Sequence, residues 1–423
     1  MKKEPNDLIN KKSEIKEFYI LCGETVLKLR AKESTNPSNL TYAIPLNYED
    51  QVPIFFEIKS DTSPKILDYQ IIDDKNPPNK LIKFSICSLE KDEKITIHFC
   101  YWVLVKNRNY KDIPKNVKIP KESELPEFSK QWLVSTEAIQ SNNLFIKIKA
   151  KVLQRYNNNL MDLAKKIFFS ICFYRPILSV ARSLLEKKPF LRKTFFHKRY
   201  WTGLSDAVSG LMFGGLCVTK TNLEVALLRA NGVPSRVLIV NPIHYYSKKI
   251  DWIDALHYIT EIYVPKYGWV RAMSGIVPYQ PKNDIVLRIV YSEDENIAGN
   301  GLSYYGGMEP WFWFSNENII FDFPEDIFTL YKKGLGIPIT TGKVVNKYKI
   351  DSVMADIVFQ LMQGCWIQFE KIFSKQLDNQ GLKNYDDVIQ FQKKILQDLI
   401  ESNMKNCIEH LNKVNDLFKK IEH

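Results

Sequence analysis

One segment constrains the fold of this chain more than any other: GGLCVTKTNLEVALLRANGVPSR, residues 214–236. Its apolar side chains recur at offsets of three and four, at Leu223, Ala226, Leu227 and Ala230. This spacing predicts one face of an α-helix, and Asn231 and Gly232, followed by Pro234, predict its end. The runs that follow, SRVLIV, HYITEIYVP and YGWVRAM, are typical of strands. A helix that leads into antiparallel strands predicts an α+β domain.

The rest of the chain divides by pattern, and 423 residues suffice for two or three domains. Short runs rich in β-branched and aromatic residues alternate over 17–108 and predict a β-sandwich domain, preceded by a flexible arm at 1–16. Residues 109–128 hold three prolines and many charges, so we expect a linker there. The α+β core would then span 129–345, and a helical region 346–423.

The C-terminal helix carries a seam of apolar side chains spaced by three and four residues, at Met404, Cys407, Leu411, Val414, Phe418 and Ile421. Under three heptads is too short to define a coiled coil. Two arrangements fit the seam equally: an antiparallel hairpin with a helix at 353–373, or a helix docked on the core domain.

Cysteine usage and charge limit the chemistry. The seven cysteines include no Cys-x-x-Cys pair, which supports neither a zinc ribbon nor a dithiol redox motif, and we expect reduced thiols. The net charge of +11 is partly concentrated in EKKPFLRKTFFHKRY, residues 186–200. Basic residues interleaved with aromatics suit a weak contact with nucleic acid or an anionic surface. A solvated linker or helix face is the other interpretation.

No segment has the pattern of a membrane span, which takes about 20 apolar residues. The most apolar window, 165–185, is interrupted by Arg175 and Pro176. The first residues are polar throughout and have no pattern of a secretory leader. We therefore expect a cytoplasmic protein without a membrane span.

Cys217 follows Gly214 and Gly215 at the predicted start of the helix. Glycines suit a tight entry turn, and a sulfur in the first helical turn faces unpaired N–H groups and the positive end of the helix dipole. These features favour the thiolate, which is the nucleophilic form of cysteine. A small buried core residue is the alternative interpretation.

A thiolate nucleophile needs a base. The chain has six histidines: His98, His197, His244, His257, His410 and His423. Four of them lie in a predicted sandwich strand, in the basic run or in the helical tail, which leaves His244 and His257. His257 opens a predicted strand, and a strand start can hold a ring over a neighbouring helix terminus.

The block from Gly215 to Trp269 resembles the transglutaminase-like core, part of the papain-like group of cysteine enzymes. That family has Gly-x-Cys at a helix start, then Leu-Leu-Arg-x-x-Gly-[Ile/Val]-Pro-[Ala/Ser]-Arg, a His-x-x-x-Glu-[Val/Ile] strand, and Gly-Trp on the next strand. The matching residues are, in order, Gly215, Cys217, Leu227, Leu228, Arg229, Gly232, Val233, Pro234, Ser235, Arg236, His257, Glu261, Ile262, Gly268 and Trp269. The predicted sandwich also resembles the β domain that precedes such cores in many microbial members.

The resemblance implies a Cys–His–Asp triad with Cys217 as nucleophile and His257 as base. The family's third member closes a Gly-Trp-x-x-x-Asp strand, but this chain has Met273 there. A thioether is only a weak hydrogen-bond acceptor. Three alternatives stay open: Asp254 or Ser274 orients the imidazole, Cys217 and His257 work as a dyad, or the site is catalytically silent.

The implied function is cysteine-dependent acyl transfer or amide hydrolysis on a protein or peptide substrate, through a thioester at Cys217. Water as acceptor makes a protease or amidase, and an amine makes a transglutaminase. The alternative is an inactive transglutaminase-like interaction module. We expect no cofactor and no metal, because histidines are few and no loop has the carboxylates of a calcium site. The sequence carries no signal for oligomeric state.

Overall fold

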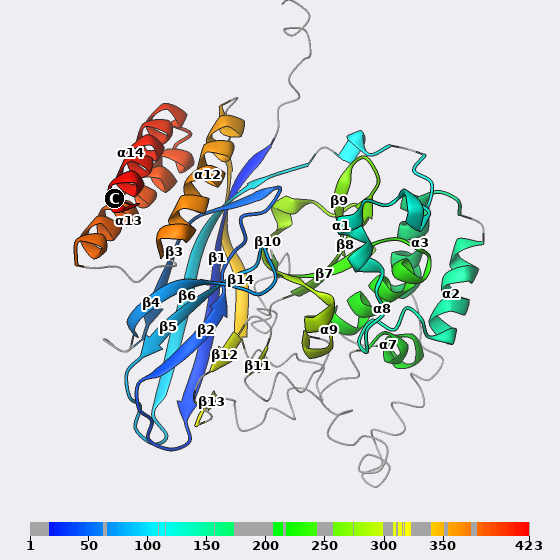
Figure 1. The fold of residues 1–423 in the computed structure, drawn as a ribbon, viewed down its shortest axis with the longest axis horizontal. Helices are drawn as coiled ribbons and strands as arrows, with labels where there is room; N and C mark the ends of the chain where they lie inside the picture. Colours follow the sequence, from blue (N-terminus) through cyan, green and yellow to red (C-terminus); the bar gives the residue numbers. More distant parts are fainter. Residues whose placement is uncertain are drawn as a thin grey trace, which may run out of the picture.

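The structure is a computed structural model. It describes residues 17–61, 66–108, 110–114, 116–155, 157–172, 206–214, 217–242, 257–273, 275–298, 308–309, 312–314, 316, 318–322, 340–350, 354–373 and 379–422. Three parts lie side by side in Figure 1: a layer of helices from the C-terminal region, a pair of β-sheets, and an α+β core with its own sheet. The arm expected at 1–16 and the basic run at 186–200 lie outside the described residues.

The first sheet is built around β1 (Phe18–Ala31), which pairs along its length with β6 (Lys94–Lys106). On the other side of β6 lies β3 (Gln51–Ser60). The free edge of β1 pairs with β14 (Thr340–Ile350) and, further along, with β13 (Ile319–Phe321). All these pairs are antiparallel, and most side chains of β1 are buried.

The second sheet has the order β11 (Met308–Glu309), β12 (Phe312–Phe314), β2 (Ser38–Ala43), β5 (Lys80–Ile86) and β4 (Ile66–Asp73). It packs on the first sheet through aromatic side chains. Tyr42 of β2 stacks on Phe99 of β6 with ring centroids 4.4 Å apart, and Phe84 of β5 meets the same ring edge-on at 5.3 Å. We call β1–β6 and β11–β14 the two-sheet unit.

Strands β11 to β14 come from residues that the sequence analysis placed in the core domain or in the helical region. The boundary expected between 345 and 346 falls inside β14. Phe18 pairs with Ile350, and Leu27 pairs with Thr340. A strand that joins its partner across more than three hundred positions leaves no local signal at the boundary.

The core domain has a four-stranded antiparallel sheet in the order β10-β7-β8-β9. Its strands are β7 (Ser235–Pro242), β8 (His257–Val264), β9 (Gly268–Ala272) and β10 (Asp284–Val290). The helices around it are α1 (Glu127–Lys130), α2 (Leu144–Gln154), α3 (Leu160–Cys172), α7 (Ala207–Phe213), α8 (Cys217–Ala230) and α9 (Ser292–Ala298). Short 3-10 turns are η2 (Tyr110–Asp112), η3 (Glu122–Glu124), η4 (Gln131–Leu133) and η5 (Pro281–Asn283).

Helix α8 is the central element of the core domain. It contacts α2, α3, α7, β7 and β8, and nearly every side chain from Val218 to Arg229 is buried. The sequence predicted one buried apolar face, but burial extends around the helix and includes its polar side chains. They find partners inside: the hydroxyl of Thr221 donates to the carbonyl of Tyr258 over 3.1 Å.

The predicted end of α8 is confirmed. Gly232 has φ 74°, and its N–H donates to the carbonyl of Arg229 while the N–H of Val233 donates to that of Leu228. This is a Schellman end, which requires the left-handed backbone that glycine adopts without strain. It turns the chain directly into β7, so helix and sheet are joined by a short, defined corner.

The C-terminal region folds as α12 (Ala355–Phe373), α13 (Asn379–Ile400) and α14 (Met404–Glu422). The predicted seam of α14 is buried at Met404, Cys407, Leu411, Val414 and Phe418. It packs against α13 and against α12. Because Leu411 lies beside Met362 and Cys365 while Phe418 contacts Phe369, α14 runs in the same direction as α12. The expected antiparallel hairpin with α12 is therefore wrong, and the adjacent helix α13 is the hairpin partner of α14. In turn, α12 lies on the first sheet, where Trp366 and Phe369 meet Phe56 of β3 edge-on.

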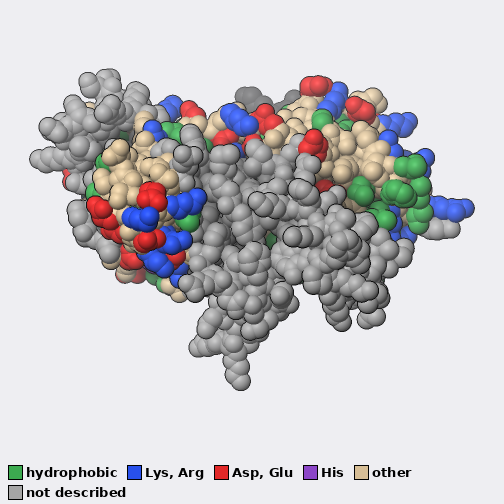
Figure 2. Space-filling model, turned by 90° about the horizontal axis from the view of Figure 1, so that it is seen from below, with side chains coloured by type: hydrophobic (Ala, Val, Ile, Leu, Met, Phe, Trp, Pro, Cys, Tyr) green, Lys and Arg blue, Asp and Glu red, His purple; other side chains and the backbone are tan. Residues whose placement is uncertain are grey.

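Helix α2 shields α8 with Ile146, Ala150 and Leu153. Its other side is open, and the exposed apolar residues there are Leu144, Phe145, Ile148 and Val152. Figure 2 shows hydrophobic side chains beside Lys and Arg at this end of the molecule. No helix in the described part of the chain is long and apolar enough to cross a membrane.

The expected fold class is confirmed. The described chain is a mixed α+β structure with antiparallel sheets, a strand-rich N-terminal region and C-terminal helices.

Candidate active site

The side chain of Cys217 lies at the start of α8, where the sequence predicts it. Helix α7 ends at Gly214, whose φ of 70° and ψ of −169° suit glycine, and α8 begins three residues later. Gly215 lies outside the described residues. The backbone N–H groups of Val218 and Tyr258 hydrogen-bond the Cys217 sulfur. The thiol is thus held by the helix terminus and by the first strand residues of β8.

His257 is the first residue of β8 and is forty positions from Cys217 along the chain. Helix α8 lies on β8, where Thr221 reaches the Tyr258 carbonyl and the hydroxyl of Thr260 donates to Glu224 over 2.8 Å. These two bonds fix the helix start over the strand start. The structure brings Cys217 and His257 into direct contact, with a hydrogen bond between thiol and imidazole.

The pKa values of the two groups shift in opposite directions. Burial opposes ionisation of the Cys217 thiol, but the charge and hydrogen bond of His257 and the two backbone N–H groups outweigh it and lower its pKa. Burial likewise opposes protonation of His257, and Cys217, then Asp284 and Glu224, outweigh it and raise its pKa. Both shifts favour the thiolate–imidazolium form of the pair over the neutral form. Neither side chain is fully buried.

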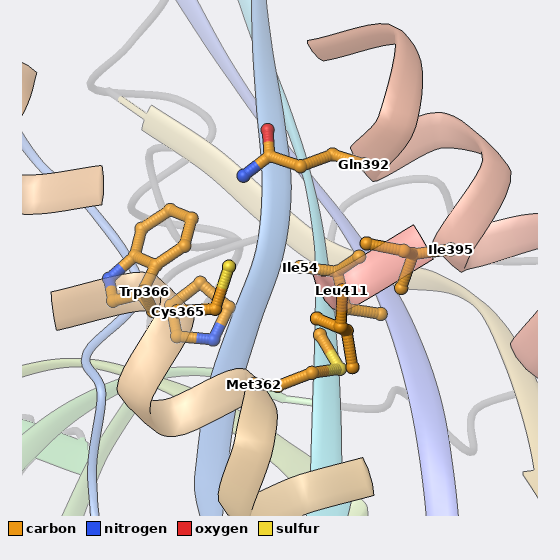
Figure 3. A pocket seen from close by; sticks show the side chains of 8 residues that line it. Ile54, Met362, Cys365, Trp366, Gln392, Ile395 and Leu411 are labelled. Carbon is orange, nitrogen blue, oxygen red and sulfur yellow. The ribbon is translucent and has the colours of Figure 1, made fainter. Parts of the chain in front are cut away.

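Other cysteines have the environment of core residues. Burial raises the pKa of Cys22, Cys365 and Cys407 to about 12. Cys365 lines a cavity of about 10 Å³ between β3 and the C-terminal helices, with Ile54, Met362 and Trp366 (Figure 3). Such a volume holds no more than one water molecule, so this cavity is no substrate site.

The structure places Met273 directly after β9, where its N–H and carbonyl pair with Ile276. Its side chain packs with an apolar cluster that includes Trp269, and it offers His257 only a thioether. Asp254 and Ser274, the two candidates for the third member, lie outside the described residues.

Two arginines of the matched motif form buried ion pairs within the core domain. Arg236 of β7 pairs with Glu261 of β8 at 2.8 Å, and its guanidinium lies 3.8 Å from the centre of the Trp269 ring. Arg229 of α8 forms a fully buried pair with Glu295 at 2.5 Å.

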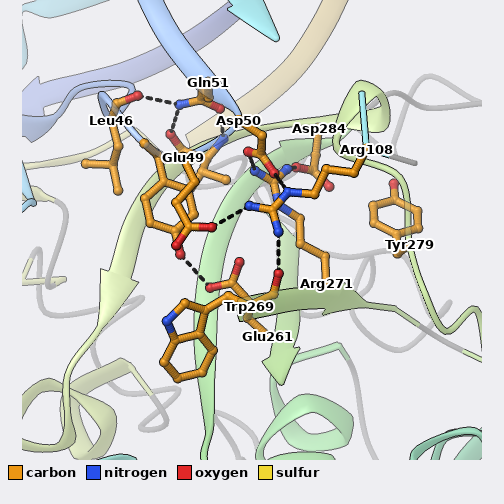
Figure 4. A network of polar contacts seen from close by, with 12 residues as sticks. Leu46, Glu49, Asp50, Gln51, Arg108, Glu261, Trp269, Arg271, Tyr279 and Asp284 are labelled. Carbon is orange, nitrogen blue, oxygen red and sulfur yellow. Dashed lines mark hydrogen bonds and ion pairs between the residues drawn. The ribbon is translucent and has the colours of Figure 1, made fainter. Parts of the chain in front are cut away.

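A network that the sequence did not indicate lies beside the site, between the two-sheet unit and the core sheet (Figure 4). Arg271 of β9 bonds both Asp50, just before β3, and Asp284, the first residue of β10, the latter at 2.5 Å. Arg108 pairs with Asp50 at 2.9 Å and donates to the Trp269 carbonyl at 2.6 Å. Asp50, Arg271 and Asp284 are all buried, so this network links the two-sheet unit to the core sheet.

No group of three His, Cys, Asp or Glu side chains in the described part of the chain is arranged to hold a metal ion.

The core domain thus combines a cysteine at a helix start with a histidine at a strand start. Residues 192–273 match the model of the transglutaminase-like superfamily. The match spans α7, α8 and β7 to β9 and ends on Met273.

Two solved structures are similar. One is a candidate cysteine protease from Cytophaga hutchinsonii, with TM-score 0.47 and 11% identity, covering 79% of this chain and 89% of its own. The other is a candidate protease from Parabacteroides distasonis, with TM-score 0.23 and 12% identity, covering 59% of this chain and 43% of its own. No curated protein sequence matches this chain significantly.

Proposed function

We propose that this protein is a cysteine-dependent enzyme that hydrolyses an amide bond of a protein or peptide, or transfers its acyl group to an amine. Cys217 is the nucleophile and His257 is the base. The single observation that carries the proposal is the hydrogen bond between the two side chains, together with the opposite shifts of their pKa values. A nucleophile in contact with its base is the signature of this chemistry.

The reaction starts when the Cys217 thiolate adds to the amide carbonyl carbon, forming a C–S bond and an oxyanion. The imidazolium of His257 then gives its proton to the nitrogen as the C–N bond breaks, which releases the amine and leaves a thioester. Neutral His257 next takes a proton from water or an acceptor amine as it attacks the thioester. The new acid or amide leaves, and the thiolate is restored.

The start of α8 supports the oxyanion. The first N–H groups of a helix have no intrahelical partner, and donors placed near a developing negative charge stabilise it. The N–H groups of Val218 and Tyr258 already hydrogen-bond the sulfur and stabilise its charge.

A second candidate function, a catalytically silent interaction module, is favoured by one observation. Met273 stands where the family's carboxylate orients the imidazole, and its side chain packs with apolar residues. An imidazole without an acceptor is free to turn away from the sulfur.

Alkylation with iodoacetamide near pH 6 distinguishes the two. At this pH an ordinary thiol, with a pKa of about 8.5, reacts slowly. We expect Cys217 to be alkylated before the other cysteines in the unmodified protein. In the variant His257→Ala we expect this preference to disappear. Cys87, Cys100 and Cys172 are half-buried like Cys217 and serve as internal controls. Reaction of Cys217 no faster than that of the controls would leave the interaction module as the function.

A further inference from the structure

The residue that replaces the missing acid can be sought by position in the core sheet. In this sheet β8 begins at His257, β9 ends at Ala272, β7 ends at Pro242 and β10 begins at Asp284. Because neighbouring strands run antiparallel, all four residues lie at the same end of the sheet. Asp284 is therefore at the end where His257 meets Cys217.

His257 and Asp284 also share a face of the sheet. His257 pairs with Val240 of β7, and Val240 pairs with Val286 of β10. Directly paired residues point to the same face, and so do residues two apart on one strand. Asp284 is two positions before Val286, so its side chain lies on the face of His257.

The sheet curves enough to bring its edges together on that face. Strands β9 and β10 are the two edge strands, yet Arg271 of β9 bonds Asp284 of β10 at 2.5 Å. The side chains at this end therefore converge over the inner face. Met273 follows Arg271 by two residues, so the position from which the family's acid is missing lies on the same face and at the same end of the sheet as Asp284.

The carboxylate of Asp284 is fully buried and incompletely bonded. Its Oδ1 accepts from Arg271, but its Oδ2 has no hydrogen-bond partner among the described residues. A buried acceptor left without a partner is costly, at about 1–3 kcal/mol, and needs a reason. The imidazole of His257 supplies such a reason, because it is nearby and carries a positive charge during part of the reaction cycle.

The electrostatic interaction between the two residues is mutual. Burial is the main influence on Asp284 and raises its pKa to about 7, while Arg271 and His257 both act to lower it. Asp284 in turn acts to raise the pKa of His257. Each charged form therefore favours the other.

Other titratable groups that face His257 are Cys217 and Glu224, both from α8. Glu224 accepts from Thr260, which lies on the opposite face of β8 from His257 and Glu261. Burial raises the pKa of Glu224 to about 8, so this carboxyl is mostly neutral at pH 7. Asp284, whose pKa is raised to about 7, is the more ionised of the two carboxyls, and it shares the face of His257.

We propose that Asp284 takes the part of the acid missing at position 273, as a positioning residue that stabilises the imidazolium of His257 from strand β10. The proposal rests on the function proposed above, with Cys217 and His257 as its reacting groups. The acid comes from a different strand than in the family pattern, and Arg271 holds it in place.

The test is the pH dependence of Cys217 alkylation in Asp284→Asn. This change keeps the shape of the side chain and a hydrogen-bond acceptor for Arg271, but removes the charge. We expect the alkylation rate of Cys217 at pH 8, where Asp284 with its pKa of about 7 is mostly ionised, to fall by up to about tenfold, since loss of a nearby charge shifts a pKa by about one unit. Asp284→Glu keeps the charge and should restore most of the rate.

Asp50→Asn is the matched control, because Asp50 is the other carboxylate on Arg271. It removes one buried charge from the same guanidinium and should lower the melting temperature similarly, with the pH profile of Cys217 unchanged. A profile in Asp284→Asn that coincides with that of the unmodified protein overturns the proposal, as does an equal shift in Asp50→Asn. If Asp284→Asn does not fold, Asp284→Ser, which also removes the charge, decides: a profile shifted from that of the unmodified protein while Asp50→Asn leaves it unchanged supports the proposal, and an unshifted profile overturns it.

The outcome also separates this proposal from the proposed function. If Cys217 of the unmodified protein shows no preference at pH 6, the function fails. If the preference is present and insensitive to Asp284, only the role of Asp284 fails.

Discussion

The thiol of Cys217 and the imidazole of His257 share a hydrogen bond where the first turn of α8 meets the first residue of β8. The contact depends on the burial of α8 against β8 and on the hydrogen bonds of Thr221 and Thr260 across that interface. Its consequences can be measured in several ways.

Removal of the imidazole should raise the pKa of Cys217. In His257→Ala the thiol keeps its burial and two backbone donors but loses the largest favourable influence. We expect the thiolate fraction of Cys217 at pH 6 to fall at least tenfold. It is measured as the ultraviolet absorbance of the thiolate, after subtraction of the absorbance of the variant Cys217→Ser. His410→Ala is the control, because His410 pairs with Asp398 in the C-terminal helices. Equal losses in both variants would contradict the contact.

Activity should depend on pH as a bell. The thiolate forms as pH rises through the lowered pKa of Cys217, and the proton that His257 donates is lost as pH rises further through its raised pKa. We therefore expect an acid limb well below the ordinary cysteine pKa of about 8.5 and an alkaline limb above the ordinary histidine pKa of about 6.5. The rate of thioester formation on a peptide ester reports both limbs. A rate that rises through pH 8.5 without a plateau would speak against a poised pair.

An acid restored at the family's position should compensate for the loss of Asp284. Met273 lies at the same end of the sheet and is partly buried, so a carboxylate there would face the imidazole from β9. We expect Met273→Asp to recover most of the Cys217 alkylation rate at pH 8 that Asp284→Asn loses. Met273→Asn, which carries no charge, should recover little. Equal recovery by both would mean that charge is not the missing property.

The buried pair of Arg236 and Glu261 should matter for stability. Both side chains are almost fully buried, and Glu261→Ala leaves the guanidinium without its carboxylate. We expect the free energy of unfolding, measured with denaturant, to fall by about 3–5 kcal/mol. The exposed pair of Asp416 and Lys419 is the matched control, and Asp416→Ala should cost less than about 1 kcal/mol. Similar costs for the two variants would contradict the scaffold role.

The local parts of the fold were accessible from the sequence. The end of α8 at Gly232 and the seam of α14 follow from residues within one or two turns of each other, and both are confirmed. The strand after Gly232 and the strand at His257 also lie where the alternation of the sequence indicates them.

The parts that depend on distant segments were not accessible. The edge of β1 is completed by β13 and β14, and the polar side of α8 is buried by partners from β8 and α9. The position of Asp284 could not be predicted from the sequence either. It follows a short 3-10 turn, and its pairing with Arg271 joins two edge strands of the folded sheet. No pattern in the printed sequence encodes the curvature that brings these strands together.

The most direct measurement is a structure of the protein after reaction with an electrophilic peptide aldehyde or chloromethyl ketone. The account predicts a covalent bond to the sulfur of Cys217, with the imidazole of His257 within hydrogen-bond reach of it and Asp284 on the same side of the sheet. A probe attached instead to Cys87, Cys100 or Cys172, or an imidazole turned away from the labelled sulfur, would contradict it.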